Sequence, residues 1–290
     1  MDKHTPDMLV SVFRGCRLAL HIFYGILLAV IYPHMNRARQ RRIVKNWSAH
    51  LLIILHIRIR IEGQQHTHGE SGCMTVANHV SWLDIFVLNA IHPSLFIAKS
   101  EVRDWPVVGW LCRRSDTIFI ERAQRQNTSK INQRIGLLLR QGASIGLFPE
   151  GTTTDGAQVG HFHSSLLQSA IDAGARLRPV ALRYQNEEGK LSRSAAFTGD
   201  MTLVQSIWQI LRCPRHNALV VFTPALMADK TNRRMLARTA QEAISEVLQT
   251  IGATPHIVER PAISFFPQTP LSSPSAYALL VDPLLQQLPK

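Results

Sequence analysis

Hydrophobic and polar positions change their spacing along the chain, and the change predicts two kinds of structure. Residues 18–33 form the most apolar window and residues 47–57 form a second one, so an apolar helical pair is expected near the N-terminal end. Beyond them, Ile57, Ile59 and Ile61 alternate with charged residues. This period of two predicts a half-exposed strand.

Short apolar runs then alternate with helical patterns as far as residue 250. The predicted strands are bounded by turn residues and cover residues 73–77, 95–98, 117–120, 144–148, 177–184 and 218–223. The predicted helices carry apolar residues at helical spacing and cover residues 82–90, 129–141, 162–173 and 232–250, with a short helix after the bend at 105–110. This alternation predicts an α/β fold in which a sheet is packed with helices.

The pattern divides the chain into three regions. Residues 1–55 are expected to be membrane-associating helices, and residues 56–254 an α/β domain. Residues 255–290 mix prolines with polar and apolar residues, and we expect a tail that is loosely ordered or docks on the surface.

A basic cluster separates the two apolar windows and consists of Arg37, Arg39, Arg41, Arg42 and Lys45. Such a cluster beside an apolar helix favours anionic headgroups and the cytoplasmic face of a membrane, here the inner membrane. The first window is slightly short for a helix that crosses a bilayer. A spanning helix and a two-helix anchor lying in the interface therefore both remain open.

Charge and cysteine content narrow the class of partner. The formal net charge is +12 and the pI is about 10.2, which favours an anionic partner. A nucleic-acid-binding protein would be expected to place its charge beside aromatic residues or in a helix-turn-helix, and the sequence has neither pattern. The four cysteines are scattered without a Cys-x-x-Cys motif, which argues against a zinc ribbon and fits a reduced, cytosolic-facing compartment.

A polar pair follows the predicted strand at 73–77. His79 lies just beyond this strand, and Asp84 lies in the first turn of the next predicted helix, which Ser81 can cap. A carboxylate in this position can hydrogen-bond the imidazole, fix its tautomer and make it a general base. For such a pair alone, a histidine that merely satisfies a turn would be the commoner interpretation.

A second motif changes this balance. Phe148-Pro149-Glu150-Gly151-Thr152 follows about seventy residues later, at the end of another predicted strand. Together the two motifs resemble the glycerolipid acyltransferase family, typified by bacterial 1-acylglycerol-3-phosphate O-acyltransferases, which is marked by Asn-His-x4-Asp and Phe-Pro-Glu-Gly-Thr. Both motifs are intact here. The resemblance extends over residues 47–250 in motif order and implies a mixed α/β sheet flanked by helices.

The resemblance also implies a reaction. A fatty acyl group would move from acyl-CoA or acyl-carrier protein to the free hydroxyl of a lysolipid at a membrane surface, with 1-acyl-sn-glycerol-3-phosphate as acceptor and phosphatidic acid as product. His79 would act as general base and Asp84 would orient it. The acceptor hydroxyl takes the place of an enzyme nucleophile, which agrees with the lack of a Gly-x-Ser-x-Gly motif. No metal or other cofactor is expected.

Four further residues carry over from the family as acceptor-binding residues: Arg122, Glu150, Gly151 and Thr152. Arg122 ends Phe-Ile-Glu-Arg, in which Glu replaces the Asp that is usual in the family. An arginine commonly follows the Phe-Pro-Glu-Gly-Thr motif, and this chain has Thr153 instead.

Because Thr153 replaces this arginine, more than one head group on the acceptor lipid is compatible with the sequence. A lyso-ornithine lipid or another lysolipid is the alternative acceptor, and Arg176 or Arg178 is a candidate replacement for the missing charge. A non-catalytic membrane-binding protein that kept the fold is the alternative from another class. That alternative predicts a disrupted His79 or Asp84, and both residues are present.

Overall fold

A computed structural model describes residues 8–67, 71–120, 125–228 and 231–253. In this part of the chain, a mixed sheet has the strand order β1-β7-β6-β2-β5-β3-β4, with β8 paired to β6. The strands are β1 Ile57–Glu62, β2 Cys73–Ala77, β3 Leu95–Lys99, β4 Ile118–Ile120, β5 Ile145–Leu147, β6 Arg176–Gln185, β7 His216–Phe222 and β8 Leu226–Met227. The helices are α1 Met8–Ile31, α2 Arg37–Ile54, α3 Leu83–Ile91, α4 Val108–Arg114, α5 Arg125–Arg140, α6 Gln168–Asp172, α7 Leu203–Leu211 and α8 Arg233–Ala253.

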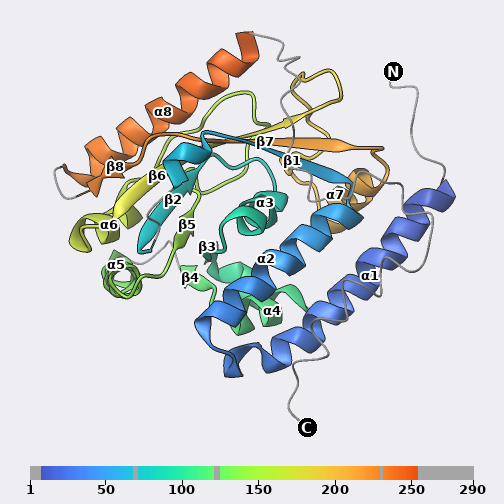
Figure 1. The fold of residues 1–290 in the computed structure, drawn as a ribbon, viewed down its shortest axis with the longest axis horizontal. Helices are drawn as coiled ribbons and strands as arrows, with labels where there is room; N and C mark the ends of the chain where they lie inside the picture. The colour runs from blue at the N-terminus through green and yellow to red at the C-terminus, as the bar shows by residue number, and fades with distance from the viewer. Residues whose placement is uncertain (1–7, 68–70, 121–124, 229–230, 254–290) are drawn as a thin grey trace.

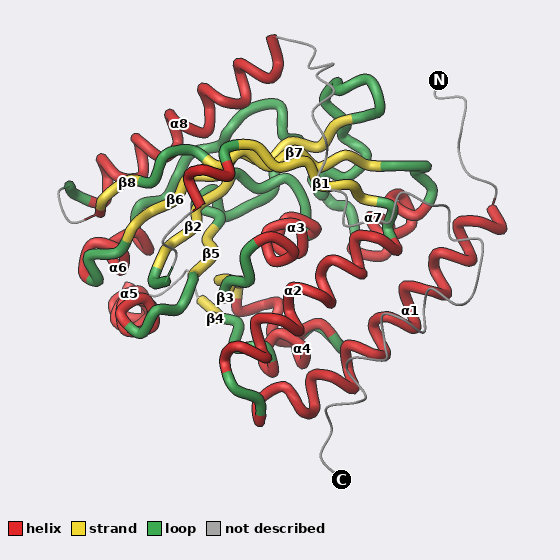
Figure 2. The backbone as a smooth tube through the Cα atoms, in the orientation of Figure 1, coloured by secondary structure: helices red, strands yellow, loops and turns green. Residues whose placement is uncertain are grey.

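Helices cover both faces of the sheet (Figure 1, Figure 2). One hydrophobic cluster joins the sheet to α2, α3 and α7, and a second joins it to α5, α6 and α8. Strand β2 contributes to both, since Val76 belongs to one cluster and Ala77 to the other. A strand buried on both faces reads as a continuous apolar run, which is why residues 73–77 were predicted correctly. The mixed α/β fold expected from the sequence is confirmed.

Five adjacent strands run parallel, and their direction decides where the motifs meet. The parallel pairs are β6–β2, β2–β5, β5–β3 and β3–β4, whereas β7 pairs antiparallel with β6. The carboxyl ends of β2, β5, β3 and β4 therefore lie along one edge of the sheet. His79 and Glu150 follow the ends of β2 and β5 within three residues, and Lys99 is the last residue of β3. Ligands bind at such an edge in α/β proteins.

Helix α1 has an unusual distribution of side chains. Its buried residues form one stripe along the helix: Ser11, Arg14, Leu18, His21, Gly25 and Ala29. Its outer face is apolar and exposed, and includes Leu9, Phe13, Leu20, Phe23, Leu27 and Val30. Figure 1 shows α1 as the outermost helix, alongside α2. A soluble helix normally buries its apolar face and exposes its polar one, so α1 is turned the other way.

Specific contacts hold this inverted helix against the domain. Arg14 donates to the backbone oxygens of Leu211 and Cys213, at 3.2 and 2.9 Å. The His21 ring stacks on the Trp47 indole, with centroids 4.6 Å apart. Gly25 has no side chain and so leaves room for the same indole. Helix α1 begins at Met8, ten residues before the predicted window, and the segment Met8–His34 is long and apolar enough to cross a membrane.

Helix α2 differs from the expected arrangement. The basic cluster does not form a turn between two helices, because it lies inside α2, which Asn36 caps by accepting the Arg39 N–H at 2.9 Å. Arginine and lysine are good helix formers, which explains the extension. The second half of α2 is buried in the core through Leu51, Leu52 and Ile54.

Two other elements were not predicted as they are found. Helix α7 was missed, although its Thr202–Gln205 capping box was readable in the sequence. The predicted helix at 162–173 is only a 3-10 turn at Ser165–Leu167 followed by the short α6, and the chain before the turn is irregular with Phe162 buried in the core. None of the four cysteines, all of which lie in the described residues, forms a disulfide; Cys73 is buried and Cys112 is half-buried.

Candidate active site

Asn78 fixes the start of the turn that carries His79. Its side chain donates to the oxygen of Leu182 at 2.9 Å and accepts the N–H of Leu182 at 2.7 Å. The side chain thus takes the place of a backbone partner and continues the pairing of β2 with β6 for one more position. The backbone is then free to leave the sheet immediately before His79.

His79 and Asp84 are hydrogen-bonded in a buried turn. The distance from His79 Nδ1 to Asp84 Oδ2 is 2.9 Å, and Oδ2 also accepts the N–H groups of Val80 and Ser81, at 2.7 and 2.9 Å. Asp84 is fully buried. Because Oδ2 also accepts two backbone N–H groups, it is suited to accept a hydrogen bond from Nδ1, and Nε2 is the ring nitrogen that Asp84 does not engage.

The second carboxylate oxygen of Asp84 has a different partner. Tyr184, a fully buried residue of β6, donates its hydroxyl to Asp84 Oδ1 at 2.8 Å. Burial and the adjacent carboxylate raise the pKa of Tyr184 well above its ordinary value, which keeps the phenol protonated as a donor. The sequence analysis missed this residue, since its only signal was an aromatic at the end of a predicted strand.

The His79 ring lies against the second motif. It stacks on Phe148, with centroids 4.0 Å apart and planes 8° apart, and Phe148 in turn stacks on Phe96 at 5.5 Å. The His79 side chain keeps 18% of its surface exposed, whereas Asp84 keeps none. The aromatic stack and the carboxylate therefore hold the imidazole from two sides and leave a third side open.

Glu150 is turned toward the backbone of His79. Its Oε1 accepts the His79 N–H at 3.0 Å, and its Oε2 accepts the Gly160 N–H at 3.2 Å. Burial raises the pKa of Glu150 above its ordinary value, although these N–H groups oppose the rise. Gly151 follows with a φ of 71°, a left-handed conformation that favours glycine. The carboxylate thus fixes the position of His79 within the turn.

The three threonines that follow have separate roles. Thr152 is exposed and lines the cavity beside His79. Thr153 donates its hydroxyl to the backbone oxygen of Phe197. Thr154 donates its N–H to the oxygen of His79 at 2.8 Å. The residue that replaces the usual arginine therefore ties two loops together.

A cavity of about 1150 Å³ has His79 in its wall. Helices α1, α2, α3 and α4 and strand β3 supply nearly half of the rest of the wall, largely through apolar side chains. Gly151 and Thr152 line the same cavity, whereas Glu150 does not belong to its described lining. Because Nδ1 is engaged by Asp84, Nε2 is the ring nitrogen left for a molecule in this cavity.

Cationic candidates lie in several places. Arg122 lies outside the described residues, so its predicted role stays a prediction. Arg178 is buried within the sheet opposite Thr75, and Arg176 is two pairs further from the carboxyl edge, so neither replaces a cation at the site. Lys99 and His163 line the cavity, and the N–H of His163 donates to Pro149 at 2.9 Å. The sequence analysis missed Lys99, whose signal was its position at the end of a parallel strand.

The described residues contain no group of His, Cys, Asp or Glu arranged to hold a metal ion. The chemical groups at the site are an imidazole with a free Nε2, a buried carboxylate behind it and backbone N–H groups beside it. With an apolar cavity adjoining them, these groups define an enzyme site suited to activating a hydroxyl on an apolar substrate.

Comparisons with known proteins assign this site to a family. The family model described as Acyltransferase matches residues 58–183. The 1-acyl-sn-glycerol-3-phosphate acyltransferase of Neisseria meningitidis serogroup B is 34% identical over 250 residues, which are 86% of this chain and 97% of that protein. The lyso-ornithine lipid O-acyltransferase of Pseudomonas aeruginosa is 36% identical over 205 residues, 71% of this chain and 78% of that protein.

A solved structure agrees with this assignment at the level of the fold. The crystal structure of the 1-acyl-sn-glycerophosphate acyltransferase PlsC from Thermotoga maritima matches with a TM-score of 0.58 and 19% identity, covering 83% of this chain and 98% of that one. The chain belongs to the acyltransferase family, and within it to the lysolipid acyltransferases. The expected family and enzyme class are thereby confirmed.

Proposed function

We propose that this enzyme transfers a fatty acyl group from an acyl thioester to the free hydroxyl of 1-acyl-sn-glycerol-3-phosphate, forming phosphatidic acid. The observation that carries the proposal is the bond between His79 Nδ1 and a fully buried Asp84 in the wall of an apolar cavity. The whole-length similarity to the Neisseria meningitidis protein supports this acceptor.

The proposed reaction begins with proton removal. The acceptor hydroxyl attacks the thioester carbonyl carbon while His79 Nε2 takes the hydroxyl proton, and Asp84 stabilises the resulting imidazolium. The N–H groups of Thr152 and Thr153 are suited to stabilise the oxyanion, since both residues line the cavity. The tetrahedral intermediate then collapses, the carbon–sulfur bond breaks, and the imidazolium returns the proton to the leaving thiolate.

The two substrates require different surroundings. The apolar wall formed by α2, α3, β3 and α4 suits fatty acyl chains. At the carboxyl edge of the sheet, Lys99, His163 and the Thr152 hydroxyl are candidates to contact the acceptor phosphate, together with Arg122. The donor is acyl-CoA or acyl-carrier protein, and the scheme needs no metal or other cofactor.

A lyso-ornithine lipid is the second candidate acceptor. Thr153 stands where the family commonly supplies an arginine, and its hydroxyl is engaged by the backbone of Phe197. A site with one fewer cation is less specialised for a phosphomonoester. The relative from Pseudomonas aeruginosa, named for this acceptor, is as similar as the Neisseria protein.

The membrane is the proposed location of the acceptor. The exposed face of α1 is apolar along its length, while its buried stripe lies along the domain from Ser11 to Ala29. A helix held in this way is suited to lie in the plane of the interface with its outer face in lipid. The exposed Arg37, Arg39 and Arg42 at the start of α2 favour anionic lipids on the cytoplasmic face of the inner membrane.

An acceptor panel tests the proposal. Purified enzyme is given a radiolabelled acyl-CoA, or acyl-carrier protein carrying the same chain, with matched 1-acylglycerol-3-phosphate, lyso-ornithine lipid and lysophosphatidylcholine. We expect labelled phosphatidic acid as the main product. Preferential acylation of the lyso-ornithine lipid would replace the first candidate by the second. No diacyl product from any acceptor, with either donor and a folded protein, would contradict the proposed reaction.

A further inference from the structure

Asp84 has two carboxylate oxygens with unequal surroundings. Oδ2 accepts from His79 Nδ1 and from two backbone N–H groups of the same turn. Oδ1 accepts from the Tyr184 hydroxyl at 2.8 Å, across a separation of one hundred residues. The local turn therefore supplies the donors to Oδ2, and a distant strand supplies the donor to Oδ1.

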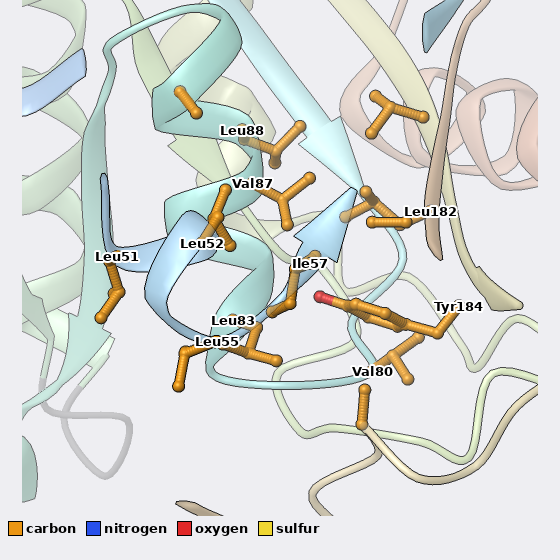
Figure 3. Packing of buried hydrophobic residues seen from close by; sticks show 14 of the residues in the cluster. Leu51, Leu52, Leu55, Ile57, Val80, Leu83, Val87, Leu88, Leu182 and Tyr184 are labelled. Carbon is orange, nitrogen blue, oxygen red and sulfur yellow. The ribbon is translucent and has the colours of Figure 1, made fainter. Parts of the chain in front are cut away.

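The surroundings of Tyr184 make this hydroxyl important to Asp84. Figure 3 shows the Tyr184 ring among Val80, Leu83 and Leu182, with its hydroxyl oxygen turned toward α3. Tyr184 is 1% exposed and Asp84 is fully buried, so water cannot readily replace either partner. A buried charged oxygen that loses its donor is strongly disfavoured.

We propose that Tyr184 is a positioning residue for acyl transfer, which fixes the plane of the Asp84 carboxylate and weakens the interaction of this carboxylate with the His79 ring. This inference rests on the proposed role of His79 as base. The hydroxyl disperses part of the carboxylate charge, so Asp84 stabilises the imidazolium without retaining its proton too strongly. The same strand, β6, also holds Asn78 through Leu182, so β6 fixes both ends of the turn.

Tyr184→Phe removes the hydroxyl and keeps the ring. We expect kcat to fall about 10- to 100-fold, as for other partners that orient a reacting group, with the KM of both substrates changed less than about twofold. The undispersed carboxylate would stabilise the imidazolium further, so the acid limb of the kcat–pH profile should move to higher pH. The charged and titratable groups near this turn are His79, Asp84 and Glu150.

A conservative replacement tests the opposite direction. Fluorotyrosine at position 184 keeps the size and the hydroxyl, and its more acidic phenol is a better donor. The acid limb should then move to lower pH, with the fold unchanged. This variant decides the question even if Tyr184→Phe fails to fold, and a profile that does not move would overturn the proposal.

A double-mutant cycle separates this role from general stability. If Tyr184 acts through Asp84, Tyr184→Phe should lower kcat much less in an Asp84→Asn background than in the wild type. Thr223→Val is the matched control, because it removes another buried hydroxyl, which bonds Pro179 at 3.1 Å. We expect this control to lower thermal stability without moving the pH profile.

The outcomes distinguish the two proposals. If His79→Ala is inactive while Tyr184→Phe and the fluorotyrosine variant keep the wild-type kcat–pH profile, His79 remains the general base and the role of Tyr184 is refuted. If His79→Ala retains full activity, the proposed mechanism itself is refuted. Full additivity of Tyr184→Phe with Asp84→Asn would likewise show that Tyr184 does not work through the carboxylate.

Discussion

His79 is held through its side chain and through its backbone by different carboxylates. Asp84 engages the ring, whereas Glu150 accepts the His79 N–H at 3.0 Å and the Gly160 N–H at 3.2 Å. The sequence resemblance implied that Glu150 binds the acceptor, and that role stays a prediction. Its geometry supports a positioning role, because its carboxylate faces two backbone donors.

Replacing Glu150 by glutamine should disturb this arrangement. The amide nitrogen of Glu150→Gln would meet one of the two N–H groups donor to donor, which leaves that N–H without a partner. We expect the variant to lose about 1–3 kcal/mol of unfolding free energy and kcat to fall at least about tenfold. The measurements are chemical unfolding and initial rates.

Glu242→Gln is the matched control for this substitution. Glu242 forms an exposed ion pair with Arg238 on α8, at 2.7 Å, and such pairs contribute little. Its stability and rate should match the wild type. Equal behaviour of the two variants would show that Glu150 does not position His79.

Residues of the site differ in how readily sequence reveals them. His79 and Asp84 lie within one turn, so their contact follows from local spacing. Tyr184 is one hundred residues away from Asp84, and only the pairing of β6 with β2 brings it close. Lys99 likewise reaches the site only because β3 pairs with β5. Register between distant strands is a tertiary property that a single sequence does not state.

The strands and most helices follow from the sequence, because the core imposes a clear hydrophobic pattern on them. The start of α1 does not, since its polar stripe faces inward and its apolar face outward. Helix α7 was missed because it is only nine residues long and lies between two irregular segments. The limits of each region, including the tail at 255–290, stay predictions.

Close contact between α1 and α2 depends on Gly25. A Cβ added there would lie 2.7 Å from Trp47 Nε1, closer than packing allows. Gly25→Ala should therefore lower the unfolding free energy by about 1–3 kcal/mol. Gly15→Ala is the matched control on the same helix, since its Cβ would lie 3.7 Å from Leu211 and should be neutral or stabilising. Equal stability of the two variants would show that α1 is not closely docked on Trp47.

Acid should weaken the packing of α7 on β7. His216 is 1% exposed, and burial lowers its pKa from 6.5 to about 4. Between these values the unfolded chain binds a proton that the folded chain does not, so stability falls as pH falls. This one histidine should cost about 2 kcal/mol between pH 7 and pH 5.

Unfolding measured across this range in His216→Gln should show a shallower decline than the wild type. His21, His56 and His92, with pKa values also lowered to about 4, would contribute to the remaining slope. The exposed His34→Gln should leave the decline unchanged. A wild-type slope in His216→Gln would contradict the assignment of a neutral, buried His216.

At the scale of the whole molecule, α1 and the basic start of α2 both contribute to the cavity wall, and the opposite face of α1 is apolar and exposed. Phe23 and Leu27 are 59% and 53% exposed on this face. We expect Phe23→Asp/Leu27→Asp to reduce binding to phosphatidylglycerol-containing vesicles about tenfold or more, measured by cosedimentation. Activity on short-chain acceptors dissolved in detergent should be retained.

Leu137→Asp is the control for this surface. Leu137 is 51% exposed on α5, so its substitution replaces an exposed apolar side chain by an aspartate at a different site. Vesicle binding by this control should equal that of the wild type. If both variants bind vesicles equally, the membrane-binding surface lies elsewhere on the molecule.

The most direct test of the account is single-turnover acyl transfer by wild type and His79→Ala, with labelled acyl donor and saturating 1-acylglycerol-3-phosphate. A folded His79→Ala should form diacyl product about 10²- to 10⁴-fold more slowly, with unchanged binding of both substrates. A rate within about tenfold of the wild type would contradict general-base catalysis by His79.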